Sequence, residues 1–133
     1  MVIETSAVLA ILLREPEAED FAAAIEKASP RLLSAASPLE ASVVIEVRKG
    51  DEGGRDLDLF IYRSGIEVVA VDAPQAEAAR RGCRRFGKGR HPAALNYGDC
   101  FAYALAKVTG SDLLFAGEDF ARTDITAASI EGT

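Results

Sequence analysis

The chain has little of what several common catalytic centres require. It contains one histidine and two cysteines among 133 residues. A lone His91 without a close cysteine pair argues against a zinc site. Cys83 and Cys100 are too few for a disulfide scaffold, so a reducing cytoplasm is the expected location. The chemistry of this protein must therefore come from other side chains.

Long apolar segments and phosphate-binding glycine loops are also missing. No apolar stretch approaches the roughly 20 residues that a bilayer-spanning helix needs. The first residues lack the basic segment, apolar core and cleavage site of a secretion signal, so secretion is not expected. Ser6, Ser37 and Cys100 lack the partners of a nucleophilic triad. We find no glycine loop of the P-loop kind.

Length and composition indicate an ordinary globular protein. The 133 residues, 49% hydrophobic and 27% charged, predict one domain over residues 1–133. The net charge of −6 disfavours nonspecific binding of nucleic acid. Of 15 basic residues, however, six lie between positions 80 and 90. That density is typical of a phosphate-contacting patch, and it fits a solvated helix face equally well.

Short apolar segments alternate with helical ones along the chain. We expect strands at residues 2–3, 31–34, 66–71 and 113–115, and an edge strand near 125–130. The expected helices cover residues 6–13, 16–28, 37–49, 53–63, 74–86 and 96–108, with a short helical turn at 119–121. Ser37 and Asn96 would cap two of them, and Gly50 would end one. This alternation predicts a parallel sheet with helices on both faces.

Four acidic residues stand at the edges of apolar runs: Glu4, Glu40, Asp99 and Asp119. In the predicted sheet they lie near the carboxyl ends of the strands, where ligands bind in such folds. Gathering like charges costs free energy, so a fold that does so usually holds a hard divalent cation. An all-oxygen site favours Mg²⁺ or Mn²⁺, which promote phosphodiester hydrolysis.

Two of these acids also have a simpler explanation. Glu40 and Asp99 each follow a predicted cap, Ser37 or Asn96, by three residues, where a carboxylate stabilises the start of a helix. Both acids nevertheless share a helix face with apolar residues, and acids on an inward face are rare unless they are paired or bind a ligand. For Glu40 those apolar neighbours are Val43, Val44 and Val47.

Asp119 and His91 are less specific signals. Gly117-Glu118-Asp119 could form a surface turn, and Glu118 and Asp124 compete with Asp119 as ligands. His91, flanked by basic residues and proline, is interpreted as a loop residue or an RNA contact.

Several segments resemble the PIN-domain family, and within it the VapC toxins of bacterial toxin–antitoxin pairs. They are residues 1–7, Glu40, the Asn-Tyr-Gly-Asp-Cys segment at 96–100, residues 114–120 and residues 123–125. The loop Gly87-Lys88-Gly89-Arg90-His91 resembles the corresponding loop of that family. The likeness extends over essentially the whole chain. It implies a three-layer α/β fold with a central parallel sheet of four to five short strands.

The resemblance also implies an activity and partners. The expected protein is a Mg²⁺- or Mn²⁺-dependent endoribonuclease acting on tRNA or ribosomal RNA. It would form a homodimer, be neutralised by a VapB-type antitoxin that threads a segment over the active site, and contact operator DNA only through that antitoxin.

The resemblance assigns roles to individual residues of this chain. Glu4, Glu40, Asp99 and Asp119 would be catalytic, with Glu4, Asp99 and Asp119 binding the metal. Thr5 or Thr123 would hold carboxylates through hydroxyl hydrogen bonds. The residues expected to contact RNA are Arg84, Arg85, Lys88, Arg90 and His91.

Glu4 departs from the family pattern, which has aspartate at that position. The extra methylene moves the carboxylate by roughly 1.3–1.5 Å, and Mg²⁺ requires near-ideal octahedral geometry. Reduced activity is therefore expected. The alternative is a catalytically disabled PIN module that binds antitoxin or RNA without cleaving it. A phosphoacceptor domain of the response-regulator type fits less well, because no paired acid follows the first strand.

Overall fold

The computed structural model describes residues 1–130 and centres on a parallel sheet of four short strands. The strands are β1 (Val2–Ile3), β2 (Leu32–Ser34), β3 (Glu67–Val69) and β4 (Leu113–Leu114). Their order across the sheet is β3-β2-β1-β4. Val2 pairs with Leu32 on one side and Leu113 on the other. The expected parallel sheet is confirmed.

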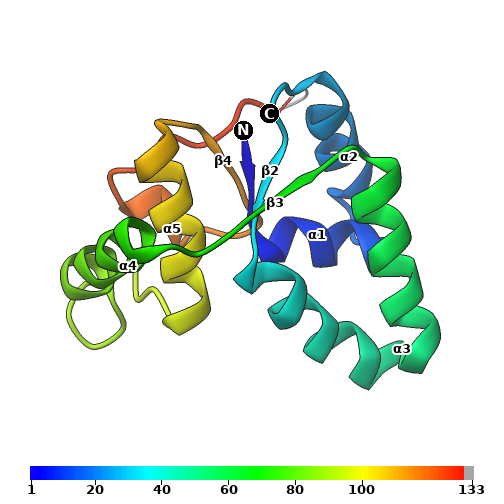
Figure 1. Cartoon of the computed structure of the whole chain (residues 1–133), viewed down its shortest axis with the longest axis horizontal. Helices are drawn as coiled ribbons and strands as arrows, with labels where there is room; N and C mark the ends of the chain where they lie inside the picture. The colour runs from blue at the N-terminus through cyan, green and yellow to red at the C-terminus, as the bar shows by residue number, and fades with distance from the viewer. Residues whose placement is uncertain (131–133) are drawn as a thin grey trace.

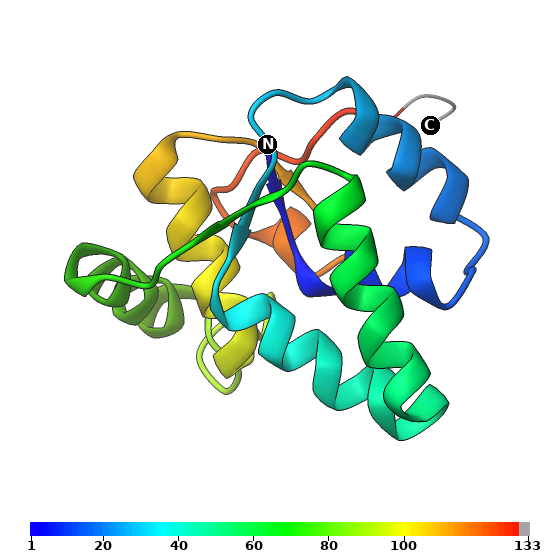
Figure 2. The same ribbon diagram turned by 45° about the vertical axis from the view of Figure 1, so that its right-hand side comes forward.

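Helices cover both faces of this sheet, as Figure 1 and Figure 2 show. Helices α4 (Ala73–Phe86) and α5 (Tyr97–Thr109) lie on one side. On the other side lie α1 (Thr5–Leu12), α2 (Ala18–Lys27) and α3 (Ala36–Arg63). A short 3₁₀ helix, η1 (Phe120–Arg122), follows β4. The predicted three-layer α/β architecture is therefore correct.

The strands divide the core into two parts because successive side chains of a strand point to opposite faces. Val2, Leu32 and Leu113 pack with α4 and α5, whereas their neighbours Ile3, Leu33 and Leu114 pack with α1, α2 and α3. All six side chains are buried. Burial on both faces explains why the strands read as continuous apolar pairs and not as alternating patterns.

Helix α3 departs from the sequence-based expectation at its start. It begins at Ala36, and its capping residue Ala35 makes no side-chain hydrogen bond. Ser37 is buried inside the helix and does not cap it, so the predicted capping box with Glu40 is wrong. The preceding residue Ser34, fully buried in β2, makes only a long hydrogen bond to the amide of Ala36, at 3.4 Å.

Gly50 divides α3 as expected, although no separate loop follows it. Its backbone dihedrals, φ 63° and ψ −154°, are not helical, and helical structure resumes directly afterwards instead of at residue 53. A positive φ is readily reached only by glycine. The two halves of α3 consequently run in different directions (Figure 2).

The predicted edge strand near residues 125–130 is present only as one isolated β-bridge. Ala127 forms a single parallel bridge with Leu113, supported by hydrogen bonds between Leu113 and the backbones of Thr126 and Ala128. Across residues 1–130, no helix is both long and apolar enough to cross a membrane.

We predict that Leu105→Ala lowers the free energy of unfolding by about 2–5 kcal/mol, because it opens a cavity in the core beneath α5. Leu105 is fully buried there. Val108→Ala, at a position of the same helix that is 51% exposed, should change the free energy by less than about 0.5 kcal/mol. Urea unfolding of both variants checks this, and equal losses would contradict the assignment of the core.

Candidate active site of four carboxylates

Four elements bring the predicted acids to the carboxyl edge of the sheet. Glu4 directly follows β1, Glu40 lies in the first part of α3 after β2, Asp99 lies in the first turn of α5, and Asp119 precedes η1 after β4. The negative charges of Asp99 and Glu40 act on Glu4, and those of Glu40 and Asp119 act on Asp99. The four acids therefore lie in the same region, near the carboxyl edge of the sheet.

Glu4 is buried, with only 4% of its surface exposed, and it caps α1. Its Oε2 atom accepts hydrogen bonds from the amide of Ser6, at 2.8 Å, and from the Ser6 hydroxyl. The same hydroxyl oxygen accepts a hydrogen bond from the amide of Ala116, at 2.9 Å. Ser6 therefore connects the end of β1 to the chain beyond β4. No local sequence pattern indicates this role of Ser6, because Ala116 lies 110 residues away in the chain.

Glu40 is held by two neighbours that lie far from it in the sequence. The hydroxyl of Thr5, which is buried, donates a hydrogen bond of 2.5 Å to Oε1 of Glu40. On the other side Glu40 lies against Gly98 of α5, where a Cβ atom would overlap Oε2 of the carboxylate. Only glycine allows α5 to approach α3 so closely. The expected hydrogen bond from Thr5 to a carboxylate is present.

Asp99 takes part in the predicted capping box of α5. Its Oδ2 accepts a hydrogen bond from the amide of Asn96, and Oδ1 of Asn96 accepts one from the amide of Asp99, each at 2.9 Å. These bonds fix the side chain at the start of the helix, where a negative charge is favoured. Capping and membership of the acidic site therefore coexist in one residue.

Burial and mutual repulsion disfavour ionisation at this site. Burial raises the pKa of Glu4 to about 7, and the charges of Asp99 and Glu40 add smaller contributions in the same direction. The pKa of Asp99 is also raised, first by burial and then by the charges of Glu40 and Asp119. The hydrogen bonds from Ser6 and Asn96 oppose these increases without cancelling them. Glu4 and Asp99 therefore keep their protons to a higher pH than free carboxylic acids do.

The chemistry of the donor set fits a hard divalent cation, since every candidate ligand is a carboxylate oxygen. The hydrogen bonds described above engage Oε2 of Glu4, Oε1 of Glu40 and Oδ2 of Asp99, which leaves a second oxygen on each side chain. Over residues 1–130, however, no three His, Cys, Asp or Glu side chains are grouped so that they could hold a metal ion. Of the four acids, Asp119 is the exposed one.

Thr123, expected to hold a carboxylate through its hydroxyl, bonds to the backbone of its own turn instead. The Thr123 hydroxyl donates to the carbonyl of Phe120 at 2.7 Å and accepts from the amide of Ile125 at 3.2 Å. The predicted hydrogen bond from Thr123 to a carboxylate is therefore wrong, because this hydroxyl binds the backbone of the turn.

Asp124 connects the C-terminal segment to α4 and α5. Its carboxylate accepts hydrogen bonds from the hydroxyl of Tyr103 at 2.9 Å, from Lys107 at 3.0 Å and from Arg85 at 3.3 Å. Because it binds three side chains from α4 and α5, Asp124 acts as a structural anchor.

Some side chains of the basic segment make contacts within the protein, and the others extend into solvent. Arg84, Lys88 and Arg90 are exposed. Arg85 pairs with Asp124 and lies 4.9 Å from the ring centre of Phe86. His91 accepts a hydrogen bond at Nδ1 from the amide of Ala93, at 3.0 Å, and its ring packs edge-on against Phe86.

The face of α3 that carries Glu40 is not buried as expected. Val43 and Val47 are 60% and 85% exposed, whereas Ala41 and Ile45 are the residues that enter the core. The expectation that Glu40 projects from the inward face of its helix is therefore wrong. Glu40 is instead held at the site by its hydrogen bond from Thr5 and by its contact with Gly98 at the start of α5.

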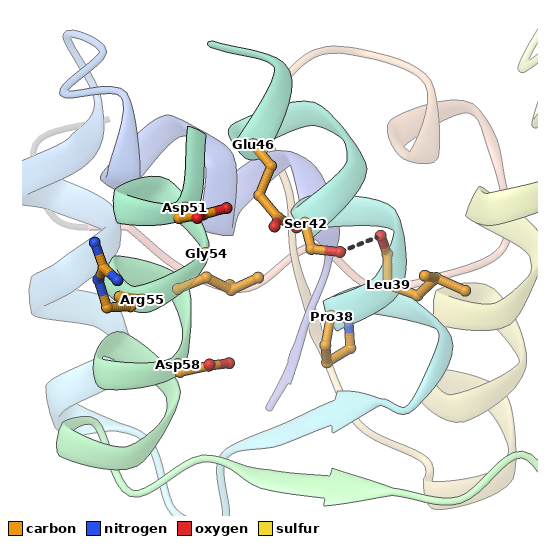
Figure 3. A pocket seen from close by; sticks show the side chains of 9 residues that line it. Pro38, Leu39, Ser42, Glu46, Asp51, Gly54, Arg55 and Asp58 are labelled. Atoms are coloured by element: carbon orange, nitrogen blue, oxygen red, sulfur yellow. Dashed lines mark hydrogen bonds between the residues drawn. The ribbon is translucent and has the colours of Figure 1, made fainter. Parts of the chain in front are cut away.

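A hollow of about 510 Å³ lies between the two halves of α3 (Figure 3). Its lining includes Leu39, the residue that precedes Glu40. Acidic side chains, Glu46, Asp51 and Asp58, line it together with one basic residue, Arg55. Leu39, which is 69% exposed, contributes an apolar side chain. The hollow therefore suits a partner that is basic and partly apolar.

Comparison with known proteins identifies the family. The PIN domain family model matches residues 1–125. The chain belongs to the PIN domain family. It is 56% identical over 130 residues to Ribonuclease VapC30 of Mycobacterium tuberculosis, covering 98% of this chain and 99% of that one. It is 58% identical over 127 residues to Ribonuclease VapC of Mycolicibacterium smegmatis, covering 96% and 98%.

Solved structures share the same PIN fold at low sequence identity. The structure of Mycobacterium tuberculosis VapC20, described as a sarcin-ricin loop cleaving toxin, matches with a TM-score of 0.75 and 14% identity over 94% of this chain and 95% of that one. The structure of VapBC2 from Rickettsia felis bound to a promoter DNA fragment matches with a TM-score of 0.74 and 14% identity, covering 98% of each chain. Both support the three-layer architecture.

We predict that stability without metal falls as pH rises from about 4.5 to about 7, because folded Glu4 keeps a proton that the unfolded chain releases. At about 1.4 kcal/mol per pKa unit, the loss amounts to about 3 kcal/mol. Glu4→Gln should remove most of this dependence, whereas Glu26→Gln on exposed α2 should leave it intact. Urea unfolding in EDTA across this pH range measures the effect. Parallel curves for Glu4→Gln and the unchanged protein would contradict it.

Proposed function

We propose that this chain is the toxin of a type II toxin–antitoxin pair, and that it is a Mg²⁺- or Mn²⁺-dependent endoribonuclease acting in the cytoplasm. The observation that carries this proposal is the gathering of Glu4, Glu40, Asp99 and Asp119 at one edge of the sheet, with the pKa values of Glu4 and Asp99 raised. Relatives at 56–58% identity are named ribonucleases, which supports the same activity.

In this proposal Glu4, Asp99 and Asp119 hold the metal, which when bound polarises the phosphate and stabilises charge on the leaving oxygen. Glu40 has a different role, that of a general base. Because Thr5 binds its Oε1 and Gly98 lies against its Oε2, the carboxylate has a fixed orientation. In this proposal Glu40 accepts a proton from the water that attacks the phosphorus.

Exposed basic residues supply the contacts to RNA. The acidic site repels a polyanion, so local cations must hold the substrate against a net charge of −6. Arg84, Lys88 and Arg90 are exposed and suited to phosphate contacts. Arg85 and His91 already make contacts within the protein, so they are less free to reorient towards RNA. We assign them to the edge of the RNA-binding surface. The substrate is tRNA or ribosomal RNA.

The partner is a VapB-type antitoxin, and the acidic hollow within α3 is suited to a basic segment of it. The structural neighbours include VapBC2 of Rickettsia felis with promoter DNA and FitAcB of Neisseria gonorrhoeae. A chain with this net charge is poorly suited to bind operator DNA by itself, so DNA contact would come through the antitoxin. We also propose a homodimer, with the exposed apolar residues Val43, Val47 and Tyr97 among the candidates for burial.

A second function, a binding module that no longer cleaves RNA, is favoured by one observation. Glu4 has one methylene more than the aspartate of the family pattern, and its Oε2 is turned towards Ser6. A carboxylate held in this way is offset from the geometry that Mg²⁺ prefers. The two functions differ in whether the chain cuts RNA, which an assay with Glu4→Asp decides.

We predict that purified protein cleaves tRNA or ribosomal RNA in Mg²⁺ or Mn²⁺, and that Glu4→Asp raises the rate by up to about 100-fold, because it restores the ligand position. Asp99→Asn should abolish cleavage. Gel analysis of end-labelled RNA measures all three proteins.

Two outcomes separate the alternatives. Cleavage that persists unchanged in EDTA would rule out the metal mechanism. If neither the unchanged protein nor Glu4→Asp cuts RNA while both bind it, the non-cleaving module is correct.

We predict that Thr5→Val lowers the cleavage rate by about 10–100-fold, because Glu40 loses the donor that orients it. Thr5→Ser keeps the hydroxyl and should retain most of the rate. The comparison is made in the more active of the Glu4 and Glu4→Asp backgrounds, with thermal melting as a check on folding. Equal rates for Thr5→Val and Thr5→Ser would show that this hydrogen bond does not position Glu40.

A further inference from the structure

Two thiols meet in the interface between α4 and α5. Cys83, in the last part of α4, is exposed, whereas Cys100, in the first turn of α5, is 4% exposed. Both line one cavity of about 280 Å³, whose other walls are mostly apolar: Ala76, Ala79, Arg80, Tyr97 and Phe101. The cavity gives a small reagent access to the pair from the surface.

The two thiols line the same cavity from different helices. An interaction with the Cys83 side chain also acts on the Cys100 thiol. The chain after Cys83 turns back at Gly87, whose backbone bridges to Leu95. The Cys100 thiol in turn contacts the carbonyl of Asn96 at 3.3 Å. The segment between the two cysteines is therefore a closed loop that already brings its ends together.

We propose that Cys83 and Cys100 form an oxidisable dithiol, a modification site that closes to an intrachain disulfide on reaction with hydrogen peroxide or an organic hydroperoxide. Helices α4 and α5 already pack directly against each other, and closure requires the two Cα atoms to lie about 4.4–6.8 Å apart. The chain contains no third cysteine, so no other intrachain pairing competes.

The chemistry proceeds in two balanced steps. The exposed Cys83 sulfur attacks the peroxide, the O–O bond breaks, and Cys83 becomes a sulfenic acid with release of water or an alcohol. The Cys100 sulfur then attacks the Cys83 sulfur, the S–O bond breaks, and a second water leaves. The two thiols lose two hydrogens, and the peroxide is reduced by two electrons. Exposure decides the order, because the buried Cys100 meets the reagent only through the cavity.

The disulfide would connect the acidic site to the basic segment. Cys100 is adjacent to Asp99, and Cys83 is adjacent to Arg84. Oxidation also removes the hydrogen that Cys100 directs at the carbonyl of Asn96, the residue that caps α5 and holds Asp99. An effect on RNA cleavage through these residues rests on the proposed function, whereas formation of the disulfide does not.

The test uses the intact protein, first reduced and freed of reductant, then treated with hydrogen peroxide. The sample is unfolded in the presence of iodoacetamide, and the intact mass is measured. The expected product is a monomer about 2 Da lighter, with no alkylated cysteine and a peptide that links Cys83 to Cys100. Cys83→Ser should instead leave Cys100 free for alkylation. Cys100→Ser should leave Cys83 to form higher acids or adducts.

Three results would overturn the proposal. They are alkylation of both cysteines after oxidation, stable sulfinic acid on Cys83 with Cys100 still free, and a covalent dimer in place of the crosslinked monomer. A comparison with urea-unfolded protein adds a kinetic criterion. Closure should be faster in the folded protein, and an equal or slower rate would show that the fold does not position the pair. None of these readouts depends on nuclease activity.

Discussion

Burial of several carboxylates close together at the carboxyl edge of the sheet is the constraint on which the rest of the site depends. Each acid could relieve it by turning to solvent, and the fold prevents this for three of the four through specific contacts. Ser6 holds Glu4, Thr5 holds Glu40, and the Asn96 cap holds Asp99. Gly98 then permits α5 to bring its acid against α3. Ionising these carboxylates in this position is unfavourable, and a bound divalent cation would offset that cost.

The parallel sheet makes this gathering possible with very short strands. Because β1 and β4 are neighbouring strands, the residues that follow them lie side by side. The Ser6 hydroxyl connects the two segments by accepting a hydrogen bond from the amide of Ala116. The two cores on opposite faces hold α3 and α5 in place, so that their first turns converge on the same edge. Stability of the core and geometry of the site are therefore coupled through the same helices.

Local signals in the sequence predicted most of the fold, and long-range contacts explain what they missed. Apolar pairs flanked by turns located the strands, and Asn96 with Asp99 predicted the cap of α5 correctly. The start of α3 was misplaced because Ser37 resembles a cap, although it is buried inside the helix. Glu40 was expected on an inward face because its valine neighbours look like core residues, yet they are exposed. The contact of Glu40 with Gly98 links distant segments that periodicity does not connect.

The most direct test of the account is the effect of a divalent cation on the thermal midpoint at neutral pH. A ligand that binds only the folded state raises its stability, so Mg²⁺ or Mn²⁺ should raise the midpoint of the unchanged protein. Asp99→Asn should lose that increase, and it should melt at or above the unchanged protein in EDTA because one repulsive charge is gone. If neither cation changes the thermal midpoint of the unchanged protein, the claim that these carboxylates form a metal site is contradicted. The same holds if the midpoint of Asp99→Asn rises with cation as much as that of the unchanged protein.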